Sequence, residues 1–485
     1  MKIASDNVIL DTDSYKISHW LQYPPNTTAL LSYIESRGST IGIDGTVFFG
    51  LQMALDILAQ PITMNDVEEA KSFADVHIGK GIFPYEGWKY IVEKLEGKLP
   101  VEIKAVPEGT FVPTHNVLVT IRSTDENVPW VVSWLETQLL RAVWYGTNVA
   151  TISNSIRGLI YNSLVQTSDD PDGGIMFKLH DFGSRGVSSR ESAAIGGAAH
   201  LINFMGSDTI VGIIAANHHY DAPMAGFSIP AAEHSTITTW GKEGELDAYR
   251  NMLKNFAKPG SVVAIVSDSY DLHKAIDEFW GDKLKQEIID SGATIVIRPD
   301  SGIPEVIVME VLHSLDAKFG HTVNSKGFKV LNNVRVIQGD GVNEGSIRLI
   351  LFKMKEAGYS TDNIAFGMGG ALLQSHNRDT FKFAYKTSLA RINGQDVEVF
   401  KDPVTDPGKR SKSGDLDLVE TTFGDIMTID KNSPVIDIIS HSLLHTVYLN
   451  GKITKRHTLD EIRARVNARI KSETAKYVSK THVLA

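Results

Sequence analysis

Apolar residues follow different patterns in the two halves of the chain. Up to about residue 170, their spacing predicts helices at 51–60 and 88–97, and one or two long helices over 131–165. The runs 101–106 and 117–122 predict strands, because turn-forming proline and glycine residues separate them. The first part of the chain therefore mixes helices and strands.

From about residue 175, short apolar runs are each followed by a polar or glycine-rich turn and then by a helical segment. The runs are 176–180, 262–267, 294–299, 334–338 and 363–366, and the turns read DFGSRG, DSYD, DSG, GDG and GMGG. Apolar strands that alternate with helices indicate a parallel sheet covered on both faces. The pattern predicts a barrel-like α/β domain over about 170–385.

Polar residues stand where these strands are expected to end. In parallel α/β folds, ligand-binding groups gather at the carboxyl ends of the strands. One such turn more often only shapes the chain. Five in series, four of them with aspartate, favour a functional edge.

The tail returns to a mixed pattern. Residues 397–412 form a proline-interrupted loop rich in lysine and arginine, and 443–455 predict a hairpin that turns at Asn450-Gly451. The segment 458–478 predicts an amphipathic helix.

Composition narrows the function classes. The 485 residues are 42% hydrophobic and 22% charged, and the net charge is -10. An acidic chain is a poor candidate for non-specific nucleic-acid binding. The absence of cysteine excludes disulfides, thiolate nucleophiles and cysteine metal sites. No apolar run reaches the roughly 18 residues of a membrane span, so we expect a soluble cytoplasmic protein without nucleic-acid or membrane partners.

Several motifs, spread in order over nearly the whole chain, carry a family resemblance. The chain resembles the nicotinamide phosphoribosyltransferases, of the type II phosphoribosyltransferase family, in DTDSYKISHW (11–20), KLHDFGSRGVSS (178–189), IPAAEHSTIT (229–238), VSDSYDL (266–272), IRPDSG (297–302), VIQGDGV (336–342), AFGMGGALLQ (365–374) and FKDPVTDPGKRSKSG (400–414).

The resemblance implies a fold and a reaction. The fold is an irregular α/β barrel packed with an α/β sandwich domain. Residues 1–150 would begin the sandwich, 151–385 would form the catalytic barrel, and 386–485 would return to the sandwich. The reaction joins nicotinamide to phosphoribosyl pyrophosphate for NAD biosynthesis, with Mg2+ and with stimulation by ATP. A homodimer with shared active sites is also implied.

Five residues resemble the family's nicotinamide-binding residues. Phe182 and Tyr15, the latter supplied by the other subunit, would stack on the two faces of the ring. Asp208 would accept a hydrogen bond from the carboxamide, which suits an amide and opposes the carboxylate of nicotinate. Arg185 and Arg298 resemble residues near the amide and the ribosyl phosphate. Taken alone, each is more often a core aromatic, a helix cap or a solvated arginine.

A second group resembles phosphate- and ribose-binding positions. Glycine lets the backbone approach an anion closely, and guanidinium groups bind phosphate in bidentate fashion. Taken alone, a glycine cluster is often only a tight turn, and a basic run is usually a solvated loop. The residues are Gly339, Asp340, Gly369, Gly370, Arg378, Lys386, Arg37, Lys401 and Lys409.

The catalytic and metal candidates are a histidine and three aspartates that follow successive predicted strands. His234 resembles the family histidine that ATP phosphorylates, and a neutral imidazole is a competent nucleophile. Asp271 and Asp300 are further catalytic candidates. Asp300 and Asp340 carry the oxygen ligands that suit Mg2+. For each aspartate, helix capping is an equal alternative.

Three other functions remain open. A nicotinate phosphoribosyltransferase would use the same phosphate site, and Asp208 argues against it. A binding or signalling protein could use the same scaffold without catalysis. An unrelated sugar-phosphate lyase would need a lysine or histidine at a strand end, where these turns carry aspartate and glycine.

Overall fold

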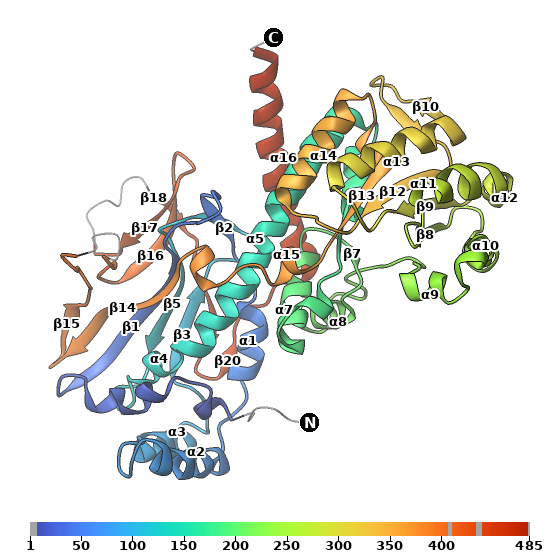
Figure 1. Ribbon diagram of the computed structural model, residues 1–485. Helices are drawn as coiled ribbons and strands as arrows, with labels where there is room; N and C mark the ends of the chain where they lie inside the picture. Colours follow the sequence, from blue (N-terminus) through green and yellow to red (C-terminus); the bar gives the residue numbers. More distant parts are fainter. Residues whose placement is uncertain (1–6, 406–409, 433–438, 484–485) are drawn as a thin grey trace. The chain divides into compact units, whose positions relative to one another are not determined.

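Two compact units make up the protein. The computed structural model describes residues 7–405, 410–432 and 439–483. Unit 1 comprises the chain up to Thr151 and His376–Arg465, and unit 2 comprises Ile152–Ser375 and the chain from Val466 onward. Two of the three divisions fall inside continuous helices, α5 (Glu136–Thr167) and α16 (Leu459–Val483), and the third follows Ser375 in a loop (Figure 1). The expected domain limits were 150 and 385.

Unit 1 is built on a seven-stranded sheet in which all the pairings are antiparallel. Its order is β15 (Gln395–Glu398), β14 (Phe383–Ile392), β1 (Thr27–Ser36), β5 (Val117–Ser123), β3 (Val101–Ala105), β19 (His445–Leu449) and β20 (Lys452–Ile453). Strand β1 thus lies between strands from both ends of the chain. This pairing explains why the C-terminal segment returns to the first unit.

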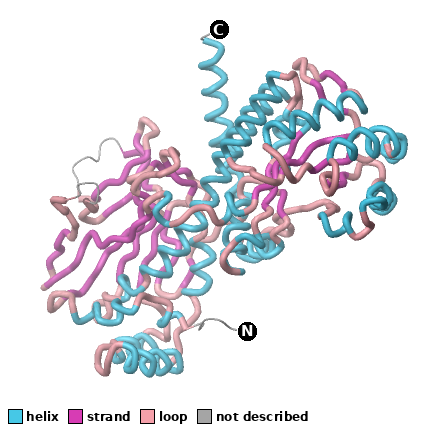
Figure 2. Tube along the Cα trace, in the orientation of Figure 1, coloured by secondary structure: helices cyan, strands magenta, loops and turns pink. Residues whose placement is uncertain are grey.

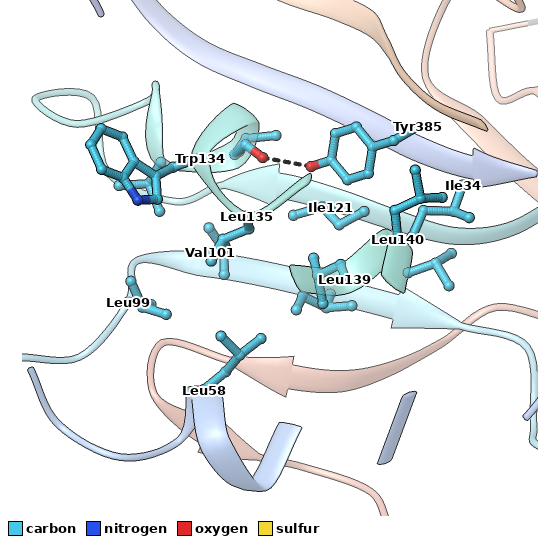
Figure 3. Packing of buried hydrophobic residues seen from close by; sticks show 14 of the residues in the cluster. Ile34, Leu58, Leu99, Val101, Ile121, Trp134, Leu135, Leu139, Leu140 and Tyr385 are labelled. Atoms are coloured by element: carbon cyan, nitrogen blue, oxygen red, sulfur yellow. Dashed lines mark hydrogen bonds between the residues drawn. The ribbon is translucent and has the colours of Figure 1, made fainter. Parts of the chain in front are cut away.

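Helices and a second sheet cover this sheet. The helices of unit 1 include α1 (Leu51–Leu58), α2 (Met64–His77), α3 (Tyr85–Lys94) and α4 (Val131–Trp134), and the small sheet contains β17 (Ile426–Asp430), β16 (Leu416–Thr421) and β18 (Ile439–Ser442). Their apolar residues form one core with the large sheet. Inside it, the Tyr385 hydroxyl donates to the carbonyl of Val132 at 2.6 Å (Figure 3), so the buried phenol is satisfied.

Unit 2 contains a six-stranded parallel sheet. Its order is β7 (Gly206–Ser207), β6 (Leu179–Asp181), β13 (Ile364–Met368), β12 (Val334–Gln338), β9 (Thr294–Arg298) and β8 (Val262–Val266). Helices α7 (Arg190–Leu201), α8 (Ile210–His219), α10 (Glu245–Phe256), α13 (Pro304–Phe319) and α14 (Glu344–Glu356) surround it (Figures 1 and 2).

An extended segment bridges the two edges of this sheet. Phe227 forms a parallel bridge with Gly206 of β7, and Ala231 forms one with Ala264 of β8. Pro230 lies between these contacts and has no N–H to donate, although its carbonyl accepts from the Ala264 amide at 3.0 Å. The segment therefore closes the sheet irregularly, and the predicted fold class, an irregular α/β barrel with an α/β sandwich, is confirmed.

Most predicted elements are present, but the first barrel strand was wrong in extent. The apolar run 176–180 predicted a strand, whereas Ile175–Phe177 form a 3-10 turn and the strand is Leu179–Asp181. The Lys178 amide closes this turn by donating to the Ile175 carbonyl at 3.2 Å, and its buried ammonium donates to the carbonyls of Thr361 and Ile364 at 3.0 and 2.9 Å. No helix in the described residues is long and apolar enough to cross a membrane.

Candidate active site

The carboxyl ends of the six parallel strands bring most of the predicted barrel residues to one edge. Asp181 pairs with Met368 and with Ser207, so Phe182 and Asp208 each stand one residue beyond a paired position. Arg298 ends β9 and Asp300 follows it. Gly339 and Asp340 follow β12. Parallel neighbours end at the same edge, so these residues form one candidate site.

The Phe182 ring restricts which residues fit beside it on the neighbouring strands. A Cβ atom at Gly367 would lie 1.9 Å from the Cε2 atom of that ring, so β13 can pass the ring only as glycine. A Cβ atom at Gly339 would lie 3.5 Å from the same atom, in ordinary contact. The half-buried ring packs on a small core of Ala264, Val296 and Ile337. The predicted stacking residue therefore sits at the barrel edge with a defined orientation.

A histidine and two aspartates form the most tightly connected group at this edge. The Nε2 atom of His234 lies 3.0 Å from Oδ1 of Asp268, and its Nδ1 atom lies 3.8 Å from Oδ2 of Asp300. The Asp268 side chain is 5% exposed and that of His234 is 46% exposed. A buried carboxylate accepts a hydrogen bond, so we assign the neutral tautomer with hydrogen on Nε2. The Nδ1 lone pair is then available.

Asp268 is held from its other side. Its Oδ2 atom accepts from the Asp300 amide at 3.1 Å and from the Ser301 hydroxyl at 2.6 Å. This residue was not among the sequence-predicted candidates. The predicted Asp271 lies outside the group, and its carboxylate caps α11 (Leu272–Lys274) by accepting from the Lys274 amide at 3.0 Å. The missed signal was position, because Asp268 stands closer to the end of β8.

The other predicted base-site residues differ in how firmly they are held. Asp208 is exposed, and its carboxylate accepts from the Ser228 hydroxyl at 2.5 Å. Arg298 is mostly buried, and its guanidinium donates to the carbonyl of Ala232 at 3.3 Å. Arg185 is exposed in a short turn, Ser184–Gly186. Tyr15, in unit 1, is 59% exposed.

The predicted glycine turn adjoins this edge. Strand β13 ends at Met368, and the short helix α15 (Gly370–Leu373) begins two residues later. A Cβ atom at Gly186 would lie 3.7 Å from the Gly370 backbone, so the turn that carries Arg185 lies against this glycine. A Cβ atom at Gly370 would meet nothing within 4 Å. The backbone is therefore open to a ligand here.

Unit 1 contains a separate basic cavity of about 570 Å3. Its lining includes four of the predicted phosphate-binding residues, namely Arg37, Arg378, Lys386 and Lys401, and a fifth cation that the sequence analysis missed, Lys382. Burial lowers the pKa of Lys386, and the nearby cations Arg37 and Lys401 lower it further, although Glu136 acts in the opposite direction. Such mutual repulsion favours a bound anion. The predicted Lys409 lies outside the described residues.

The resemblance implies Mg2+ at the barrel edge. The described residues contain no group of three or more histidine, aspartate or glutamate side chains suited to a metal. Mg2+ commonly uses only one or two carboxylates beside substrate phosphates and water. Within the described chain, no group donates a hydrogen bond to the carboxylate of Asp300 or Asp340. Their oxygens therefore fit a metal that is held together with a phosphorylated substrate.

Comparisons with known proteins identify the family of the chain. Residues 177–452 match the model of the nicotinate phosphoribosyltransferase (NAPRTase) family, and residues 7–103 match the nicotinamide phosphoribosyltransferase N-terminal domain. The chain is 54% identical to a nicotinamide phosphoribosyltransferase of Xanthomonas campestris, over 96% of this chain and 98% of that protein. It is 32% identical to one from Acinetobacter baylyi, over 95% and 97%.

Solved structures show the same fold at low identity. A nicotinate-nucleotide pyrophosphorylase from Pyrococcus furiosus superposes with a TM-score of 0.63 at 17% identity, covering 97% of this chain and 98% of that one. Human nicotinic acid phosphoribosyltransferase gives 0.57 at 16% identity, covering 94% and 93%. The chain therefore belongs to the nicotinate phosphoribosyltransferase family and, within it, to the nicotinamide phosphoribosyltransferases.

Proposed function

We propose that this enzyme transfers the phosphoribosyl group of phosphoribosyl pyrophosphate to nicotinamide and forms nicotinamide mononucleotide for NAD biosynthesis. The observation that carries the choice of base is the exposed carboxylate of Asp208 at the same strand-end level as Phe182. A carboxylate accepts a hydrogen bond from an amide and repels the carboxylate of nicotinate. The 54% identity to a protein named for nicotinamide supports the same choice.

The bond changes assign a task to each residue at the barrel edge. The ring nitrogen of nicotinamide attacks C1 of the ribose, and the bond from C1 to the pyrophosphate oxygen breaks, leaving its electron pair on pyrophosphate. Phe182 stacks on the ring and contributes about 0.5–1.5 kcal/mol beyond area burial. Asp208 orients the amide through a hydrogen bond that contributes about 1.5–3 kcal/mol. Arg298 and Arg185 contact the phosphoribosyl group.

The carboxylate of Asp300 would face the ribose hydroxyls. Asp300 and Asp340 would together hold Mg2+. The ion would neutralise charge on the departing pyrophosphate. Gly339, Gly369 and Gly370 would let backbone amides approach the phosphate. The carboxylates of Asp300 and Asp340 support these roles because neither accepts a hydrogen bond from the described residues.

ATP stimulation would proceed through His234. Its Nδ1 atom attacks the γ-phosphorus of ATP, and ADP leaves with the electron pair of the broken P–O bond. Asp268 keeps the hydrogen on Nε2 and stabilises the positive charge of the phosphorylated ring. Water later cleaves the N–P bond and releases inorganic phosphate. The 3.0 Å contact between His234 and Asp268 supports this sequence.

The basic cavity of unit 1 would serve the phosphates in a homodimer. We assign Arg37, Arg378, Lys386 and Lys401, with Lys409, to phosphate and pyrophosphate binding, and Tyr15 to the second face of the base in the partner's site. The gathering of cations in one cavity supports a polyanionic ligand. Sedimentation with substrate present tests the dimer, and a monomer at full activity would contradict it. A cytoplasmic location stays a prediction.

Product formation tests the proposed function. Purified enzyme is given phosphoribosyl pyrophosphate and Mg2+ with either nicotinamide or nicotinate, each with and without ATP. The proposal expects mononucleotide from nicotinamide and a faster reaction with ATP. A preference for nicotinate would keep the phosphate site and overturn the choice of base. No product from either base would favour a binding protein on this scaffold.

A further inference from the structure

The proposed function gives no role to Asp181, a buried carboxylate next to the predicted base site. Asp181 ends β6, directly before Phe182, and its side chain is fully buried. Its Oδ1 atom accepts from the Gly183 amide at 2.7 Å, whereas its Oδ2 atom has only the Thr209 hydroxyl nearby, outside good hydrogen-bond geometry. A buried carboxylate with one oxygen so poorly satisfied opposes folding, so its presence calls for an explanation.

Asp181 contacts the segments that carry Asp208 and Phe182, two of the predicted base-binding residues. Its carbonyl accepts from the Asp208 amide at 2.9 Å, and its side chain closes the turn that follows Phe182. The Oδ2 atom points at the crossing of α7 and α8, where a Cβ atom at Gly197 would lie 3.4 Å from it. The carboxylate is therefore shielded from water and lies near enough to Asp208 for the two acidic groups to interact.

Among the described residues, few charged groups act on the Asp181 carboxylate. Burial raises the pKa of Asp181 to about 6, the Gly183 amide and the nearby Thr209 hydroxyl oppose that rise, and the negative charge of Asp208 adds to it. His180 in the same strand has its pKa lowered by burial. From α7, His200 contacts Ser153 and the Gly206 carbonyl instead. Asp181 and Asp208 are therefore neighbouring acidic groups, one buried and one exposed.

We infer that Asp181 is a specificity-determining residue, whose unscreened charge excludes an anionic base from the site without touching it. Asp208 is exposed, so water and salt screen its charge, whereas Asp181 acts through a low-dielectric interior. A neutral amide is indifferent to this second charge, but the carboxylate of nicotinate is repelled by it. The inference rests on the proposed function, since it concerns discrimination at the same base site.

The substitution Asp181→Asn removes the charge of Asp181 and keeps the turn that its side chain closes. The amide oxygen of asparagine can still accept from Gly183, and the amide nitrogen replaces the poorly satisfied Oδ2 atom. A matched control is Asp290→Asn, which removes one exposed carboxylate from α12 (Lys285–Ser291) on the same unit. The readout is kcat/KM for nicotinamide divided by kcat/KM for nicotinate, measured without ATP.

We expect the ratio to fall about 10-fold in Asp181→Asn, chiefly through a gain with nicotinate, and to stay unchanged in the control. A fall carried by nicotinamide alone, or no change, would overturn the inference while the wild-type preference still supports the proposed function. A wild type that prefers nicotinate would overturn both. These results separate the two claims.

A second measurement needs no variant. In the wild-type enzyme, the same ratio should fall several-fold between pH 7.5 and pH 5.5, as Asp181 takes up a proton near its raised pKa of about 6. The ratio cancels pH effects on the phosphoribosyl chemistry that both bases share. A ratio that stays constant over this range would contradict the role of Asp181 even if the variant fails to fold.

Discussion

At the barrel edge of unit 2, Asp268 is held by an imidazole, a backbone amide and a hydroxyl, whereas the cavity of unit 1 gathers cations that repel one another. The first arrangement fixes the direction of single atoms, as at Nδ1 of His234. The second fixes only a local excess of positive charge. In the proposed function, directed chemistry therefore falls to the strand ends and retention of a polyanion falls to the cavity.

We expect the largest effect from removing His234 from the group that it forms with Asp268 and Asp300. His234→Ala removes the nucleophile, so we expect complete loss of the phosphoenzyme and of ATP stimulation, with basal synthesis within about threefold of wild type. Labelling with γ-32P ATP checks this. The exposed His218→Ala serves as the control. A labelled phosphoenzyme that persists in His234→Ala would refute the assignment.

The next effect concerns the ring that supports the base. Gly367→Ala places a methyl group 1.9 Å from the Phe182 ring and must displace it. We expect kcat/KM for nicotinamide to fall about 100-fold, because displacement by about 1 Å has that effect on a positioned group. Gly158→Ala, in α5, meets nothing within 4 Å and should leave the rate unchanged. Equal rates in both variants would contradict the placement of Phe182.

The third prediction concerns the effect of the buried Asp181 on the stability of unit 2. Burial raises its pKa in the folded protein to about 6, above the ordinary value of 3.8, so the charged form opposes folding. Stability should therefore fall as pH rises from about 4 to about 6 and then level off. At pH 7, Asp181→Asn should raise the free energy of unfolding by about 1–3 kcal/mol. Urea unfolding at pH 4 and pH 7 checks this, and a less stable variant at pH 7 would oppose it.

The smallest effect belongs to the cavity. Lys382→Met removes one of five gathered cations, so we expect KM for phosphoribosyl pyrophosphate to rise about 10-fold and to depend less on salt. KM for nicotinamide should not change. Lys431→Met removes an exposed cation that pairs with Asp415 at 3.3 Å and is the control. Kinetics at two salt concentrations measure both, and an equal response of the two variants would remove the cavity from phosphate binding.

The strand-and-turn rhythm predicted the barrel edge because local sequence determines where a buried strand ends. It selected Asp271 and missed Asp268 in the same turn, because the contacts of Asp268 with His234 and Ser301 come from distant parts of the sequence. Strands β1 and β14 were not predicted as a pair, since their partners lie more than 300 residues apart in the sequence. Lys382 lies in a turn, where its φ is 52°. The pattern of strands and helices therefore did not single it out.

The most direct test of the account is the selectivity ratio of nicotinamide over nicotinate, in kcat/KM, for the wild type and for Asp208→Asn. The account predicts a wild-type preference for nicotinamide of at least about 100-fold, and a fall of at least about 10-fold in Asp208→Asn, since a hydrogen bond and a repulsion are both lost. An unchanged ratio, or a wild type that prefers nicotinate, would contradict it.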